Sequence, residues 1–128
     1  MKMYVKSVFV DDQQKALDFY TQKLGFVKKL DMPMGEHRWL TLTSPEESES
    51  VELLLEPNAH PASKTFQAAM KADGIPFTAF STNDIAAEFE RLKQKGVHFV
   101  QEPAAMGDAQ IATFDDSCGN LIQLVQTL

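Results

Sequence analysis

The stretch that decides the fold is VDDQQKALDFYTQKLGF, residues 10–26. Its paired aspartates, Asp11 and Asp12, predict a helix start, because their side chains can accept hydrogen bonds from the free N–H groups of a first helical turn. Apolar residues then recur at helical spacing, at Ala16, Leu17, Tyr20 and Leu24. Gly25 predicts the end of the helix, since glycine readily adopts the left-handed conformation that terminates helices. The stretch is therefore expected to form an amphipathic helix.

On both sides of this helix the pattern changes to that of strands. Residues 3–10 are rich in β-branched and aromatic types, which favour a strand. Further strands are predicted from residue 26 onward, at 38–43 and at 51–55. Pro33 and Gly35 are expected to break the chain before the strand at 38–43. The first part of the chain is thus expected to have the order βαβββ.

The same order of elements restarts after a connection that contains a short helix. Asp84 and Gly96 flank a second helical pattern, at nearly the separation of Asp12 and Gly25. Strands are predicted around it, at 77–81, 97–100, 110–114 and 121–125. We therefore expect one α+β domain, residues 1–128, of two βαβββ modules: module one at about 1–57, the connection at about 58–75, and module two at about 76–128.

Composition restricts the partners of the protein. The chain has 128 residues and a formal net charge of −6. An acidic surface repels phosphate backbones, so no nucleic-acid partner is expected. No apolar run reaches the length needed to span a bilayer, so no membrane partner is expected either. Cys118 is the only cysteine, which excludes an intrachain disulfide and a cysteine zinc site and indicates a cytoplasmic protein.

Two segments resemble the signatures of a known family. Residues 10–26 resemble the opening signature of the glyoxalase/bleomycin-resistance/extradiol-dioxygenase superfamily, also called the vicinal oxygen chelate superfamily. Residues 114–124, FDDSCGNLIQL, resemble its closing signature. The segments 51–57 and 80–96 fall where the family's equivalents fall, so the resemblance covers nearly the whole chain. It implies paired modules whose curved sheets enclose a cavity, but a fold alone assigns no activity.

The resemblance also implies where a metal would be held. In metal-dependent members, the ligands come from the first strand and a late strand of each module, and the metal chelates adjacent substrate oxygens. These positions align with Val5, Phe77 and Gln123, and with Glu52, or with Leu53 if the register slips by one residue. At most Glu52 and Gln123 can act as ligands, and two weak ligands do not make a tight site. We therefore expect no metal and no other cofactor.

Without a metal, the same positions predict a pocket for a ligand. Alternate residues of the first strand share one face, and the module-two positions are expected to approach that face from the same chain or from a partner chain. Trp39, the only tryptophan, is equally compatible with a pocket floor and with a core or interface anchor. The expected pocket residues are Val5, Ser7, Phe9, Trp39, Phe77 and Gln123.

Glu52 is the candidate for a catalytic residue. Inside the cavity it could act as a general base. Strand alternation, however, puts Glu52 on one face with Leu54 and Glu56, which favours an outward, solvated side chain unless the strand carries a bulge. Cys118 lies in a turn and is expected to be structural. The three histidines lack metal spacing and are expected at the surface.

The residues leave the function open between classes. One hypothesis is a metal-free homodimer that holds a small organic molecule, such as an antibiotic-like cation, in its cavity. A second is a lyase, isomerase or dioxygenase of the same superfamily, with a rearranged metal site or with Glu52 as base. A third is a domain whose ligand is a metabolite unrelated to either. The missing ligand residues favour the first hypothesis, and unpaired sheet edges favour a homodimer.

Overall fold

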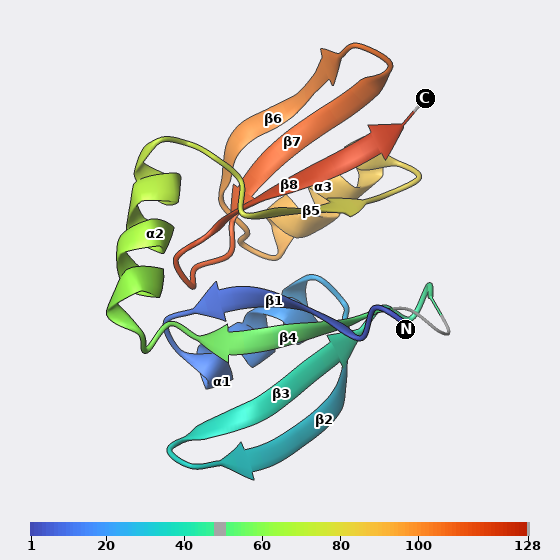
Figure 1. Ribbon diagram of the computed structural model, residues 1–128. Helices are drawn as coiled ribbons and strands as arrows, with labels where there is room; N and C mark the ends of the chain where they lie inside the picture. Colours follow the sequence, from blue (N-terminus) through green and yellow to red (C-terminus); the bar gives the residue numbers. More distant parts are fainter. Residues whose placement is uncertain (48–50, 128) are drawn as a thin grey trace.

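The computed structural model describes residues 1–47 and 51–127. It contains two four-stranded sheets (Figure 1). In the first sheet the order is β1-β4-β3-β2, and in the second it is β5-β8-β7-β6. In each, the first and last strands of the module are parallel neighbours, while the other pairs are antiparallel. The expected pair of βαβββ modules is therefore confirmed.

The strands of the first sheet are β1 (Val5–Val10), β2 (Val27–Met34), β3 (His37–Thr43) and β4 (Glu52–Pro57). Those of the second sheet are β5 (Thr78–Ser81), β6 (Phe99–Met106), β7 (Ala109–Asp115) and β8 (Leu121–Thr127). Helix α2 (Pro61–Ala72) connects the two sheets along one side of the molecule (Figure 1). Among the helices of the described residues, none is long and apolar enough to cross a membrane.

Both aspartate caps form as predicted. Asp12 accepts a hydrogen bond from the backbone N–H of Lys15 at 2.9 Å and starts α1 (Gln13–Asp18). Asp84 does the same for α3 (Ile85–Gln94). The first helix differs from expectation after residue 18, where it widens into a π-helical turn, η1 (Phe19–Lys23). In this turn the N–H of Leu24 reaches back five residues to the carbonyl of Phe19, at 3.3 Å.

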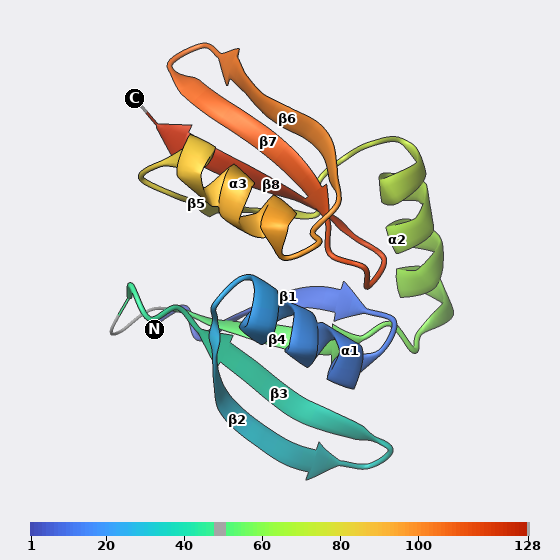
Figure 2. The same ribbon diagram turned by 180° about the vertical axis from the view of Figure 1, so that it is seen from behind.

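Helices α1 and α3 lie on the same side of the two sheets (Figure 2). Between them and the sheets the modules share one hydrophobic core. Phe19 of η1 stacks on Phe114 of β7 with ring centroids 6.3 Å apart, and Phe80 of β5 meets Phe26 edge to face at 5.0 Å. The core therefore fixes the arrangement of the modules as well as packing each one.

The outer strands β2 and β6 run further than the sequence patterns predict. Pro33 does not break the chain but lies within β2, opposite Arg38 of β3. A proline is tolerated there because β2 is an edge strand and needs no N–H on its free side. β6 likewise continues past residue 100 and includes Pro103. Both strands also carry a register irregularity, at Lys28/Leu30 in β2 and between Phe99 and Ala104 in β6.

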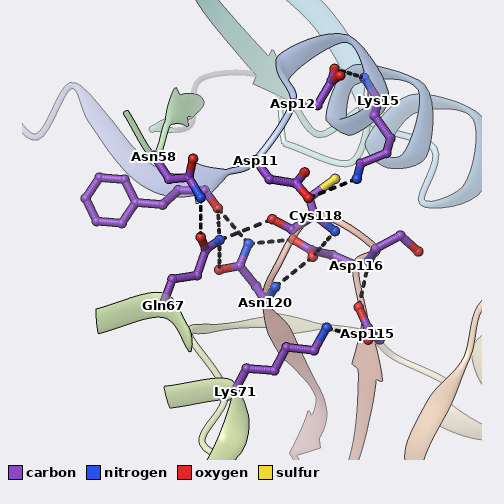
Figure 3. A network of polar contacts seen from close by, with 12 residues as sticks. Asp11, Asp12, Lys15, Asn58, Gln67, Lys71, Asp115, Asp116, Cys118 and Asn120 are labelled. Carbon is purple, nitrogen blue, oxygen red and sulfur yellow. Dashed lines mark hydrogen bonds and ion pairs between the residues drawn. The ribbon is translucent and has the colours of Figure 1, made fainter. Parts of the chain in front are cut away.

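A polar network joins α2 to both modules (Figure 3). The side-chain amide of Gln67 donates to the carbonyl oxygen of Phe9 at 2.9 Å and to that of Cys118 at 3.1 Å. Its oxygen accepts a hydrogen bond from Asn58 at 2.7 Å. Asn120, in the β7–β8 turn, also donates to the carbonyl of Phe9, at 2.7 Å. The ends of β1 and of the β7–β8 turn are thus held side by side.

Candidate functional site

Each sheet has a face that turns away from α1 and α3, and Figure 1 looks onto it. We call these two faces the open faces. On the open face of the first sheet, alternation and register bring together side chains from all four strands. They are Val5, Ser7 and Phe9 of β1, Glu52, Leu54 and Glu56 of β4, Trp39 and Thr41 of β3, and Leu30 and Met32 of β2.

The four pocket residues predicted in module one lie on this open face. Val5, Ser7 and Phe9 are the register partners of Glu52, Leu54 and Glu56 on β4. Trp39 pairs with Met32 on β2. Val5, Phe9 and Trp39 are half-buried, and Ser7 is exposed. The face therefore presents apolar and aromatic surface that other described elements only partly cover.

Of the two predicted residues in module two, the structure brings Phe77 to this group. Its ring lies edge to face against Phe9, with the centroids 5.9 Å apart, and against Phe66 of α2 at 6.2 Å. Gln123 instead lies on the open face of the second sheet, where Ala79 and Thr113 are its register partners. Contact between Gln123 and the β1 residues therefore requires a partner chain, as the homodimer hypothesis supposes.

A cavity of about 400 Å³ adjoins this aromatic group, between the end of β4 and the start of α2. Phe9, Phe66, Glu56 and His60 are among the residues that line it. Glu56 shares the strand face of Glu52, as alternation predicts, and lies on the open face beside Phe9, where it is half-buried rather than fully solvated. Phe66, which sequence patterns suggested only as a helix residue, is half exposed at the cavity wall.

Glu52 is buried, with 5% of its surface exposed. One carboxylate oxygen accepts a hydrogen bond from the hydroxyl of Thr41 at 2.8 Å, and the other lies 3.3 Å from the ammonium of Lys29. The predicted alternation is correct, but the predicted solvated state is wrong. Glu52 lies on an inner strand between β1 and β3, where neighbouring side chains such as Thr41 cover it.

The residues at the implied metal positions do not fit a metal. Val5, opposite Glu52 in the sheet, has no ligating atom, and Phe77 has none either. The carboxylate of Glu52 already faces the cation of Lys29. Across residues 1–47 and 51–127, no three His, Cys, Asp or Glu side chains come together as a metal site would require.

Residues outside the open faces agree with the sequence-based expectations. Cys118 is fully buried, and burial raises the pKa of its thiol to about 12, so the thiol stays protonated. His37, His60 and His98 are exposed, and His60 caps α2 by accepting a hydrogen bond from the N–H of Ala62 at 3.0 Å. Sequence reasoning missed Lys29, since no local pattern links it to a carboxylate on β4.

A second cavity, of about 340 Å³, lies at the junction of the modules. Core aromatic residues such as Phe26 and Phe80 form part of its wall, and Glu46, Glu47 and Glu88 contribute carboxylates. Glu88 is already paired with Arg91. None of the predicted pocket residues lines this cavity, so the open face with its aromatic group remains the candidate site.

Comparisons with known proteins agree with this architecture. The family model described as Glyoxalase/Bleomycin resistance protein/Dioxygenase superfamily matches residues 3–124. The chain is 57% identical to the uncharacterized protein YurT of Bacillus subtilis (strain 168), over 98% of this chain and 99% of that protein. The crystal structure of UcmS2 superimposes with a TM-score of 0.84 at 35% identity, covering 98% of this chain and 97% of that one.

A further similar structure is that of TnmS3, an antibiotic binding protein from Streptomyces sp. CB03234. It superimposes with a TM-score of 0.80 at 28% identity, and the match covers 100% of this chain and 97% of that one. The fold, the repeat of two βαβββ modules and the match over residues 3–124 together show that the chain belongs to the glyoxalase/bleomycin resistance protein/dioxygenase superfamily.

Proposed function

We propose that the protein binds a small organic molecule with an aromatic or amphipathic body on the open face of module one, without a metal. The observation that carries this proposal is the chemistry of that face. Half-buried aromatic and apolar side chains surround a buried carboxylate whose two oxygens are already engaged by Thr41 and Lys29. Such a surface favours apolar and stacking contacts with few polar anchors.

The comparisons support binding as the role. One of the similar structures is named as an antibiotic binding protein, at a level of identity that preserves the whole fold. The arrangement of Glu52 does not favour catalysis by this residue. Both of its carboxylate oxygens are already engaged, one by the hydroxyl of Thr41 and one by the ammonium of Lys29.

We also propose that the protein acts as a homodimer whose second copy helps to cover the open faces. Met32 and Met34 of β2 and Met106 of β6 are large apolar side chains about half exposed in the single chain. Apolar side chains at sheet edges are a liability unless another surface covers them. A partner chain would also bring a second Gln123 to the site.

Metal analysis and ligand titration test the proposed function together. Protein purified without chelators is expected to contain no stoichiometric Ni, Zn, Fe or Mn, and to lack glyoxalase activity on the hemithioacetal of methylglyoxal and glutathione. A ligand found by screening should quench or shift the fluorescence of Trp39, the only tryptophan. One equivalent of metal per chain would contradict the proposal.

Substitution of Phe77 by Ala locates the binding site. We expect weaker binding of the screened ligand in Phe77→Ala, because this ring joins Phe9 and Phe66 at the cavity. Glu90→Ala, on the exposed face of α3, is the control. Glu56 cannot serve as that control because it lines the cavity. Unchanged affinity in a folded Phe77→Ala protein would show that the ligand binds elsewhere.

A further inference from the structure

Lys29 reaches Glu52 through an irregularity in β2. The register of β2 against β3 shifts between Lys28 and Leu30, so Lys29 is the extra residue of a bulge. Its ammonium lies 3.3 Å from a carboxylate oxygen of Glu52, 23 residues away in sequence. The lysine side chain keeps 52% of its surface exposed, whereas the glutamate is buried.

We propose that Lys29 is the polar anchor for the ligand, and that the ligand carries an acidic or carbonyl oxygen that accepts a hydrogen bond from this ammonium. This inference rests on the proposed binding function of the open face. It names the ligand class as aromatic molecules with a carboxylate, sulfonate, phenolate or carbonyl oxygen. It disfavours an antibiotic-like cation at this end of the face.

The geometry supplies a cation that is held in place and still has free donors. A lysine ammonium has three N–H donors, and Glu52 accepts from Lys29 with one oxygen while its other oxygen is fixed by Thr41. Because Glu52 is buried and bonded, it restricts the mobility of the lysine tip. A restrained donor loses less entropy when it binds an oxygen than a free surface lysine does.

The charged side chains of the open face also determine at which end of the face the ligand's oxygen would lie. Lys29 and Glu52 form an ion pair that is neutral as a whole, so Lys29 acts on a ligand oxygen through its free N–H donors rather than through net charge. Glu56 is the other carboxylate of this face, and it lies at the Phe9 end, two residues along β4 from Leu54. An acidic ligand oxygen is repelled from Glu56 and can accept a hydrogen bond from Lys29, while the aromatic body lies toward Trp39 and Phe9.

The probe for this inference is anilinonaphthalene sulfonate, an aromatic anion whose fluorescence rises on apolar surfaces. The part of the probe binding that Phe77→Ala removes is the population bound on the open face, because this ring contacts Phe9 and Phe66. We expect Lys29→Met to weaken this population about tenfold, the worth of one charge-assisted hydrogen bond. Lys28→Met is the matched control, because Lys28 pairs with Leu42 on the helix side of the sheet and with Asp31.

Two further variants keep the test independent of folding. Lys29→Met with Glu52→Gln removes both charges, so no buried charge is left unpaired, and its affinity should fall as in the single variant. Glu52→Gln alone leaves Lys29 uncompensated, and its affinity for the anion should rise. Equal affinity of wild type and the double variant, or a fall in Glu52→Gln, would overturn the role of Lys29.

If the proposed binding function itself is wrong, the same measurements give a different result. In that case Phe77→Ala leaves the affinity of the folded protein for the probe unchanged, and both proposals fall. If Phe77→Ala weakens probe binding but Lys29→Met does not, binding on the open face stands and only the anchor is wrong.

Discussion

The hydroxyl of Tyr20 donates a hydrogen bond of 2.7 Å to a carboxylate oxygen of Asp116, although 96 residues separate them. Both residues are fully buried. Asp116 also accepts from the backbone N–H groups of Cys118 and Asn120, at 2.8 and 3.0 Å. A single carboxylate therefore shapes the β7–β8 turn of module two and binds it to the first helix of module one.

Loss of the Tyr20 hydroxyl should destabilise the protein. In Tyr20→Phe one oxygen of the buried Asp116 loses a donor, and we expect the free energy of unfolding to fall by about 1–3 kcal/mol. Tyr4→Phe is the matched control, since Tyr4 is 56% exposed and should show almost no change. Urea denaturation of the three proteins measures both values. Equal stability of Tyr20→Phe and wild type would show that the hydroxyl adds no net stability.

Asp116 should also make stability depend on pH. Burial raises its pKa above the ordinary value of 3.8, although its hydrogen bonds partly oppose this. The folded state then binds the proton more tightly than the unfolded state. The stability that this group contributes is full below 3.8 and is lost as the pH rises through the raised folded pKa.

The comparison of wild type with Asp116→Asn isolates this dependence. The difference between their free energies of unfolding should fall with rising pH above 3.8 and then become flat. Denaturation at a series of pH values measures it. The slope is the relevant quantity, because the substitution also changes stability at every pH. A difference that rises with pH would mean that the hydrogen bonds outweigh burial.

Gly119 and Gln67 should behave as a coupled pair. Gly119 has φ of +104°, and a Cβ there would lie 2.6 Å from the amide nitrogen of Gln67. We expect Gly119→Ala to cost about 1–3 kcal/mol in backbone strain plus the cost of the clash. In the double variant with Gln67→Ala, the clash disappears and the total cost should be less than the sum of the single costs.

The control for this comparison of single and double variants is Gly107→Ala. Gly107 also has positive φ, +59°, but a Cβ there would have no atom within 4 Å. Its cost should add to that of Gln67→Ala without coupling. Additive costs for Gly119→Ala and Gln67→Ala would instead show that the turn moves aside.

The oligomeric state is a separate prediction. Sedimentation equilibrium is expected to give twice the monomer mass of 14.3 kDa. Met32→Lys, at a residue 48% exposed on the open face, should weaken the dimer because it places a charge in an apolar interface. Ile75→Lys, at a loop residue 45% exposed, should not. A concentration-independent monomer would refute the homodimer.

Most of the fold could be predicted from signals that are local in the sequence. The capping aspartates Asp12 and Asp84 act within their own helical turns, so sequence alone predicts them. The role of Pro33 depends instead on its strand being at a sheet edge, which is a property of the assembled sheet. A strand pattern read by itself treats such a proline as a break.

For the candidate site too, some features could be predicted from the sequence and others could not. Alternation placed Val5, Ser7 and Phe9 on one face, because that rule needs only a strand. The state of Glu52 depends on the inner position of β4 and on a bulge that brings Lys29 to it. Both are properties of the assembled sheet, which composition and spacing do not encode.

The prolines and bulges of β2 and β6 bear on how the protein behaves when crowded. β2 and β6, the edge strands opposite β1 and β5, each combine a proline, Pro33 or Pro103, with a break in their pairing. A stray chain that adds as a further strand needs regular N–H donors along a flat edge, and neither of these two strands offers them. Growth into a fibril by addition to β2 or β6 is thereby blocked. A proline and a register irregularity occur in the corresponding strand of each module, so both modules have the same protection.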